Sequence, residues 1–235
     1  MTIALLLGTA LLFCQQTPEP VVVLFGDSTT APRAGVLIFA DLLKERFAKV
    51  KFINAGIGSN TTDMARERFQ QDVLDKKPDV VTIFFGLNDA AANVWQGVTE
   101  PRIPVERYTE NLRYFVQTLR GQGATPILLT PNPLAWTDEL RNLYGKPPYD
   151  TTSDAGFNIL LDRYVKAARQ VAAEENAPLI DVNRMYKDYA TGPGLSLSVL
   201  LLDGMHPNSA AHEKIAEEIA ILLKPLLPAR EAGEQ

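Results

Sequence analysis

The feature that most constrains the fold is a series of five short apolar segments rich in Val, Ile and Leu. They lie at residues 21–25, 50–54, 79–85, 126–130 and 178–182. Each is apolar on both of the faces that an extended chain presents, which is typical of strands in a parallel sheet covered on both sides. The sequence therefore predicts a buried parallel sheet of five strands.

Longer amphipathic stretches separate these segments and predict helices near residues 34–48, 62–75, 104–121, 155–176 and 208–224. In the last stretch, Ile215, Ile219, Leu222 and Leu223 fall at helical spacing and form an apolar stripe. Strands alternating with helices build right-handed crossovers with helices on both faces of the sheet. We expect an α/β fold, a three-layer α/β/α sandwich around a central, mostly five-stranded parallel sheet.

The chain of 235 residues is long enough for one large domain, which we expect at residues 21–228, followed by a flexible tail at 229–235. The formal net charge of −5 argues against a nucleic-acid partner. Lys and Arg are scattered, so the sequence shows no polybasic membrane patch. We take a monomer as the default state.

Residues 1–20 differ from the rest because they contain the uncharged apolar run TIALLLGTALLFC. This run has the length of a signal-peptide core and is short for a transmembrane helix. Cys14, the only cysteine, resembles a bacterial lipoprotein acceptor, although Phe13 stands where such signals carry a small residue. We expect a secreted or periplasmic protein, with a lipid anchor on Cys14 left open. A cytoplasmic protein with a short buried or frayed N-terminal segment is the alternative.

Small polar residues gather where the predicted strands end. The segments are GDSTT, NAGIGSNTT, GLNDA, TPNP and DVNRMY, and DGMHPN precedes the final helix. In open parallel sheets, ligands bind beyond the carboxyl ends of the strands. The sequence therefore predicts a functional site at this edge.

The two histidines narrow the chemistry of that site. His212 is expected on the solvated side of the last helix, whereas His206 follows Asp203 by three residues in a loop. An aspartate at this spacing can accept a hydrogen bond from one ring nitrogen and leave the other free to take a proton from Ser28. A helix-start turn with a surface histidine is the alternative interpretation of DGMHPN.

A nucleophilic serine also needs donors for the oxyanion that forms on its substrate. The backbone N–H groups of Ser28 and Gly56 and the side-chain amide of Asn88 are available at neighbouring strand ends. We expect these three groups to form the oxyanion hole.

Together, GDSTT, NAGIGSN, GLND and DGMHP resemble, in order and context, the four motif blocks of the SGNH hydrolases, also called GDSL esterases/lipases. The resemblance runs from residue 21 to the final helix. It implies a flavodoxin-like α/β/α fold and ester hydrolysis without a metal or cofactor. It assigns Ser28 as nucleophile, His206 and Asp203 as its partners, and Ser28, Gly56 and Asn88 as oxyanion donors.

One residue departs from the family's name, because Thr29 stands where the name has Leu. The variant is similar to rhamnogalacturonan acetylesterase-like members, and FFGLNDA resembles small-ester members of the isoamyl-acetate-hydrolysing type. We expect hydrolysis of short-chain, chiefly acetyl, esters of carbohydrates or small alcohols through an acyl-enzyme on Ser28. A lysophospholipase or thioesterase-type activity is the alternative within the family.

Two long irregular segments, residues 89–103 and 131–154, interrupt the strand–helix alternation. Each carries one tryptophan, Trp95 and Trp136. Long connections after strand ends often form binding sites. Two interpretations of these tryptophans remain open: they form a substrate-binding rim, or they pack within the loops.

Other classes of protein fit the sequence less well. Ser28 lacks the second glycine of the G-x-S-x-G nucleophile elbow, and GIGSNT lacks the third glycine of a dinucleotide-binding loop. The chain offers too few ligands for a metal site. A nucleotide- or carbohydrate-binding α/β module without catalysis is the alternative of a different class.

Four further carboxylates are predicted to have structural roles. We expect Asp27 to bond backbone amides of its turn, Asp63 to lie early in a helix where its charge suits the dipole, and Asp89 and Asp181 to hold loops or cap helices.

Overall fold

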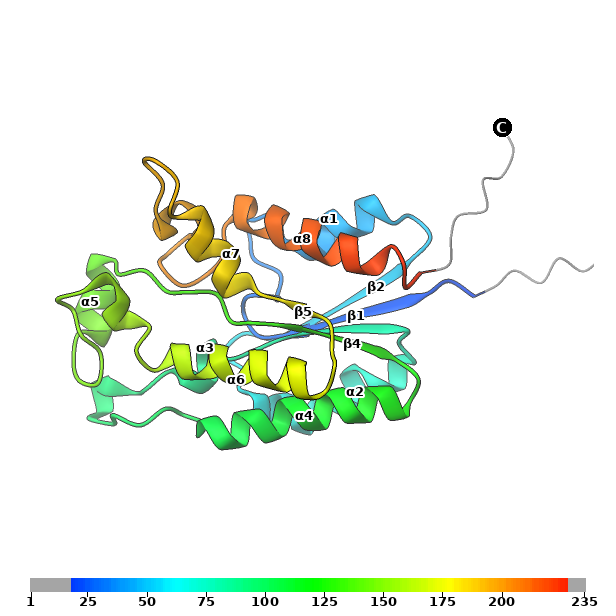
Figure 1. Ribbon diagram of the computed structural model, residues 1–235, viewed down its shortest axis with the longest axis horizontal. Helices are drawn as coiled ribbons and strands as arrows, with labels where there is room; N and C mark the ends of the chain where they lie inside the picture. Colours follow the sequence, from blue (N-terminus) through cyan, green and yellow to red (C-terminus); the bar gives the residue numbers. More distant parts are fainter. Residues whose placement is uncertain (1–17, 228–235) are drawn as a thin grey trace, which may run out of the picture.

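Five parallel strands form the centre of the molecule, in the spatial order β2-β1-β3-β4-β5 (Figure 1). The structure, a computed structural model, describes residues 18–227. The strands are β1 Val21–Gly26, β2 Lys51–Gly56, β3 Val80–Phe84, β4 Thr125–Leu129 and β5 Leu179–Ile180. This sheet confirms the predicted α/β fold. Residues 1–17, which include Cys14 and most of the predicted signal segment, and residues 228–235, which include the predicted tail, lie outside the described residues.

Helices cover both faces of the sheet. They are α1 Phe39–Arg46, α2 Thr62–Asp72, α3 Leu87–Ala90, α4 Val105–Gly121, α5 Asp138–Tyr144, α6 Leu161–Glu174, α7 Val182–Tyr189 and α8 Ser209–Leu223. Short 3-10 turns lie at η1 Leu74–Lys76, η2 Val94–Gln96, η3 Asp154–Phe157 and η4 Leu197–Leu200. Among the helices of residues 18–227, none is long and apolar enough to span a membrane.

Alternate side chains of β1 point to opposite faces of the sheet and pack into two separate cores. Val23 and Phe25 pack into the layer of α2, α4 and α6, while Val22 and Leu24 pack into the layer that contains α1 and α8. The two layers lie on opposite sides of the sheet (Figure 1). All four side chains are fully buried, and each such burial contributes about 1.5–3 kcal/mol. β1 is therefore fixed from both sides, and the position of its carboxyl end is well defined.

Several helix bounds differ from the prediction. The stretch 34–48 becomes helical only at Phe39, and the stretch 155–176 begins as the turn η3 before α6. The sequence prediction missed α3, α5 and α7. Thr137 and Asp181 cap α5 and α7 by accepting hydrogen bonds from backbone N–H groups three residues later, so short polar segments become helical.

His212 contradicts the prediction of a solvated side chain. It is only 3% exposed, and its ring lies 5.6 Å from that of Phe39 between centroids. The buried face of α8 includes His212, Ile215, Ile219 and Leu223, so the predicted stripe was centred too far toward Leu222. Burial, together with the charge of Arg33, lowers the pKa of His212 to about 4.

This buried histidine predicts a loss of stability in acid. The unfolded chain takes up a proton near the ordinary His pKa of 6.5, whereas the folded ring does so only near 4. The contribution is therefore complete above pH 6.5 and is lost as the pH falls to about 4. We expect this to remove about 3 kcal/mol from the free energy of unfolding, and His212→Leu to abolish this part of the pH dependence.

Urea unfolding of both proteins at neutral pH and near pH 4 measures the effect, since the other titrating groups are common to both. Equal pH dependence in the two proteins would contradict the assignment.

Candidate active site

Ser28 lies directly beyond the end of β1, in a turn that Asp27 organises. Asp27 is buried, and its Oδ1 accepts hydrogen bonds from Thr29 N at 2.9 Å and Thr29 Oγ1 at 2.8 Å. Gly26 lets this turn approach the sheet, because an added Cβ would come within 2.1 Å of Thr30 Oγ1. The predicted turn role of Asp27 is confirmed. Thr29 is itself buried within the turn and is not among the residues that line the cavity.

A hydrogen-bonded chain links Ser28 to His206 and Asp203. Ser28 Oγ lies 3.0 Å from His206 Nε2, and His206 Nδ1 lies 2.7 Å from Asp203 Oδ2. The other carboxylate oxygen of Asp203 accepts the backbone N–H groups of Met205 and His206, at 3.0 and 2.8 Å. The structure therefore brings together three predicted side chains from the two ends of the chain.

The pKa of Asp203 lies well below its usual range. Partial burial opposes this shift, but hydrogen bonds from the side chain and backbone of His206 and from Met205 N outweigh burial. Asp203 therefore stays ionised and can fix the His206 ring with Nδ1 as the donor.

Gly56 does not have the environment that was predicted for it. Its N–H donates to Asn54 Oδ1 at 2.9 Å, and Gly56 is not among the residues that line the cavity at Ser28. An added Cβ would lie 2.4 Å from Ala31 N, so the glycine serves close packing between the end of β2 and the Ser28 turn. The prediction of Gly56 as a donor is therefore corrected.

Ser59 occupies the position that was expected of Gly56. It lines the cavity with Ser28 and Asn88, and its φ of 62° is left-handed. Within residues 18–227 its backbone N–H has no hydrogen-bond partner. Little in the sequence points to this residue, because a left-handed φ favours glycine and two glycines precede Ser59.

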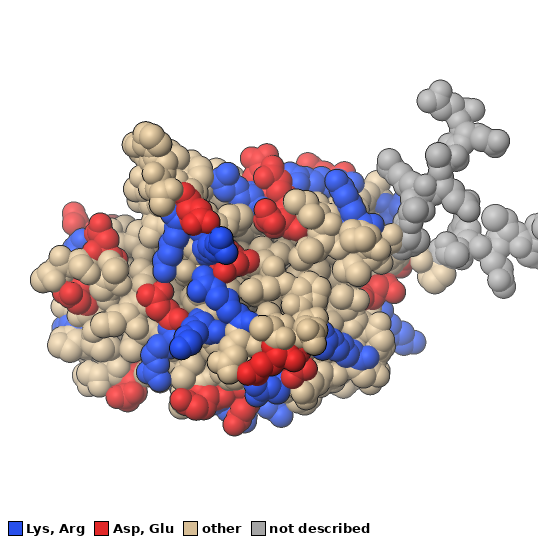
Figure 2. Space-filling view, in the orientation of Figure 1, with Lys and Arg blue, Asp and Glu red and all other residues tan. Residues whose placement is uncertain are grey.

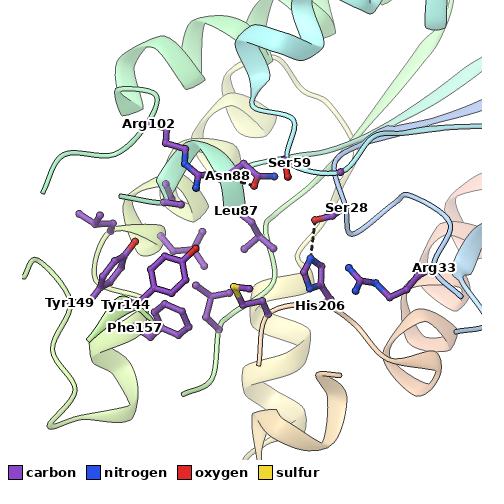
Figure 3. A pocket seen from close by; sticks show the side chains of 17 residues that line it. Ser28, Arg33, Ser59, Leu87, Asn88, Arg102, Tyr144, Tyr149, Phe157 and His206 are labelled. Carbon is purple, nitrogen blue, oxygen red and sulfur yellow. Dashed lines mark hydrogen bonds between the residues drawn. The ribbon is translucent and has the colours of Figure 1, made fainter. Parts of the chain in front are cut away.

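Asn88 lies in α3, just beyond β3, and faces the cavity (Figure 3). Its Nδ2 donates to Asn60 O at 3.1 Å and lies 3.5 Å from Asp27 Oδ2. Its Oδ1 accepts from Arg102 Nη1 at 3.5 Å. These contacts orient the amide with its N–H₂ group on the side of the Ser28 turn.

Two buried carboxylates lie behind this arrangement. Burial raises the pKa of Asp27 to about 6, although hydrogen bonds from Thr29 lower it. Burial also raises the pKa of Asp89 to about 7, opposed by Thr62, and the charge of Asp27 adds to the rise. Neither carboxylate lines the cavity.

The other carboxylates have the structural roles that were expected. Asp89 accepts from the backbone N–H of Thr62 at the start of α2, and Asp181 caps α7. Asp63 lies in the first turn of α2 and pairs with Arg107 at 2.8 Å.

The cavity at Ser28 has a volume of about 380 Å³ and extends away from His206 toward an aromatic end (Figure 3). Its polar lining comprises Ser28, Arg33, Ser59, Asn88, Arg102 and His206, together with Gly58. The remaining lining side chains are Leu87, Ala90, Ala91, Leu134, Tyr144, Tyr149, Phe157, Leu160, Leu161 and Met205. The cavity is thus polar at one end and apolar at the other.

Trp95 and Trp136 do not line this cavity. Trp136 stacks on Phe157 with ring centroids 4.1 Å apart, and Trp95 meets Tyr144 edge-on at 5.6 Å. They support the aromatic wall from behind, which favours the packing interpretation of the two loops. The sequence prediction missed the aromatic residues in contact with the cavity, although they come from or border the same long segments.

Comparisons with known proteins agree with this geometry. The model of the GDSL-like Lipase/Acylhydrolase family matches residues 24–214. The uncharacterized lipoprotein YqeF of Bacillus subtilis is 34% identical over 81% of this chain and 82% of its own length. The acetylxylan esterase of Geobacillus stearothermophilus is 26% identical over 71% of this chain and 69% of its own.

Among solved structures, the lipase/acylhydrolase from Enterococcus faecalis superposes with a TM-score of 0.70 at 30% identity, over 91% of this chain and 100% of that chain. The family match covers most of the chain and includes both ends of the Ser28–His206–Asp203 arrangement. The chain therefore belongs to the GDSL-like lipase/acylhydrolase family and is an ester hydrolase.

Proposed function

We propose that this ester hydrolase acts on short-chain, chiefly acetyl, esters and that Ser28 is its nucleophile. The observation that carries the proposal is the chain of contacts from Ser28 Oγ to His206 Nε2 at 3.0 Å and from His206 Nδ1 to Asp203 at 2.7 Å. A serine hydroxyl needs an adjacent base, and a base needs an orienting group. Both are present here.

The proposed reaction has two steps. Ser28 Oγ attacks the ester carbonyl while His206 Nε2 takes its proton, and Asp203 stabilises the resulting imidazolium. His206 then gives this proton to the departing alcohol oxygen and leaves an acyl group on Ser28. Water attacks the acyl-enzyme with His206 again as the base, which releases the acid and restores Ser28.

The oxyanion formed in each step requires donors on the opposite side of the carbonyl from His206. We assign the backbone N–H groups of Ser28 and Ser59 and the Nδ2 of Asn88 to this role. All three residues line the cavity, and Ser28 N and Ser59 N have no partner within the described residues. One such donor typically contributes about 10²–10³ in kcat.

The preference for acetyl esters rests on the related acetylxylan esterase and on the predicted likeness to acetylesterases. A panel of p-nitrophenyl acetate, butyrate and octanoate, with acetylated xylan and pectin and small alcohol acetates, tests it. We expect kcat/KM to fall from acetate to octanoate and acetyl groups to be released from at least one of the natural classes. Failure to hydrolyse any ester in the panel would overturn the proposed function and favour a binding module.

A second candidate is an acyl hydrolase for longer chains, of the lysophospholipase or thioesterase type. The apolar end of the cavity favours it. The departing alcohol must lie near His206, so the acyl group extends the other way, past Leu87 toward Tyr144, Tyr149 and Phe157 (Figure 3). A rise in kcat/KM from acetate to octanoate would select this candidate over the acetylesterase.

We propose that the protein is exported. The apolar N-terminal run and the lipoprotein among its relatives support this. Cell fractionation compared with a Cys14→Ser variant separates a lipid-anchored protein from a secreted one and from a cytoplasmic one.

A further inference from the structure

The charged residues that line the cavity are two arginines, Arg33 and Arg102, with no carboxylate among the described residues to balance them. The protein as a whole is acidic, with a net charge of −5. On the face shown in Figure 2, Lys and Arg lie interspersed with Asp and Glu rather than in a patch of one sign. The cavity therefore differs from the general surface.

Two hydrogen bonds hold the Arg102 side chain in the wall of the cavity. Its Nε donates to Asn93 Oδ1 at 2.9 Å, and its Nη1 lies 3.5 Å from Asn88 Oδ1. Its guanidinium also lies 6.0 Å from the centre of the Trp95 ring. We infer from these contacts that Arg102 orients the Asn88 side chain.

Arg33 has no such contacts. Within residues 18–227 its side chain makes no hydrogen bond and no ion pair, although it is half-buried. Its backbone carbonyl accepts from Val36 N at 3.2 Å, which fixes the turn that carries it. By contrast, seven arginines of the described chain pair with carboxylates: Arg68, Arg107, Arg113, Arg120, Arg141, Arg169 and Arg184.

The position of Arg33 defines which part of a substrate it meets. Its guanidinium points toward His206, on the side away from the aromatic end (Figure 3). His206 protonates the departing alcohol oxygen in the proposed reaction, so the alcohol lies on this side. A half-buried guanidinium without a carboxylate partner presents a planar set of donors that matches an oxyanion such as carboxylate or phosphate.

We propose that Arg33 recognises an anionic group, a carboxylate or a phosphate, on the alcohol part of the ester. This inference rests on the proposed function, because it uses the direction in which the alcohol departs. It makes Arg33 a specificity-determining residue and the natural substrate an ester of an acidic alcohol. The two anions share the same recognition chemistry, and the experiment distinguishes them.

The test compares three acetate esters of similar size. Their alcohols are ethylene glycol monophosphate, hydroxypropionate and, as the neutral reference, ethylene glycol monomethyl ether. We expect at least one anionic ester to exceed the neutral ester in kcat/KM, and Arg33→Gln to lower that ratio roughly 10- to 100-fold, the worth of a hydrogen bond to a charged group. The anionic ester whose ratio falls more in Arg33→Gln shows whether a carboxylate or a phosphate is the preferred group. Added salt should lower the wild-type ratio.

Arg46→Gln is the matched control. It removes the same charge from an exposed arginine at the end of α1, shortly before β2 begins and thus away from the carboxyl ends of the strands. We expect its anionic-to-neutral ratio to equal that of the wild type. Arg33→Lys should keep part of the preference for the anionic ester, because lysine retains the positive charge but lacks the planar set of guanidinium donors.

The outcomes separate the two proposals. Hydrolysis of all three esters with no anionic preference, or with a ratio that Arg33→Gln leaves unchanged, overturns the role of Arg33 and leaves the proposed function intact. Absence of hydrolysis of these esters and of p-nitrophenyl acetate overturns the proposed function and this inference with it. If Arg33→Gln does not fold, the wild-type ratio, its salt dependence and Arg33→Lys decide the question.

Discussion

Ser28→Ala should reduce kcat/KM for p-nitrophenyl acetate by about 10⁴–10⁶-fold, close to the rate that binding and the oxyanion donors alone support. The reason is that His206 would keep its contact with Asp203 but have no hydroxyl to activate. The fold should persist, because the only hydrogen bond that the Ser28 side chain makes within the described residues is the one to His206. Thermal unfolding monitored by circular dichroism checks this point.

A fluorophosphonate probe adds an independent readout, because it forms a covalent bond to an activated serine. We expect mass spectrometry to find the probe on Ser28 in the wild type and no adduct in Ser28→Ala. Ser198→Ala is the matched control, since the side chain of this exposed serine bonds, among the described residues, only Ser196 Oγ at 2.7 Å. Retention of a tenth or more of the wild-type activity by Ser28→Ala would contradict its role as the nucleophile.

The sheet could be predicted because strands buried on both faces are almost entirely apolar, as in β1 and in β3, where Thr82 is the one polar residue. The observed strands begin and end within one or two residues of the predicted segments. The spatial order β2-β1-β3-β4-β5 was not predicted from the sequence. The short helices α3, α5 and α7 could not be predicted in the same way. None of them carries a long periodic stripe: α5 and α7 begin at side-chain caps, and α3 has no such cap and depends on tertiary packing.

The candidate site, too, has residues that could be predicted from the sequence and residues that could not. Ser28, Asp203 and His206 could be named because each lies in a short motif, with the aspartate and histidine within one turn. The proposed second oxyanion donor could not be named, because residue type favours Gly56, whereas Ser59 has the left-handed φ and lines the cavity. The aromatic end depends on contacts among Tyr144, Tyr149 and Phe157, and these arise only when the two long segments pack together.

Asp203→Asn is the second change with a large expected effect, and it tests whether Asp203 acts through His206. We expect kcat to fall about 10⁴-fold, because an amide in place of the carboxylate no longer enforces the tautomer with Nδ1 as the donor. KM should change little, since Asp203 does not line the cavity and does not meet the substrate. Steady-state kinetics with p-nitrophenyl acetate separate the two parameters.

Asp181→Asn serves as the control for the same chemical change. Asp181 also accepts several hydrogen bonds, from Thr130, Arg169 and Arg184, but it caps α7 and is not among the residues that line the cavity. Its variant should lose some stability and keep its kcat at temperatures where it is folded. Because both variants replace a carboxylate that the fold holds in several hydrogen bonds, a purely structural role for Asp203 predicts similar losses in the two proteins. A kcat for Asp203→Asn within tenfold of the wild type, or an equal loss in Asp181→Asn, would contradict the assignment of Asp203 to the His206 ring.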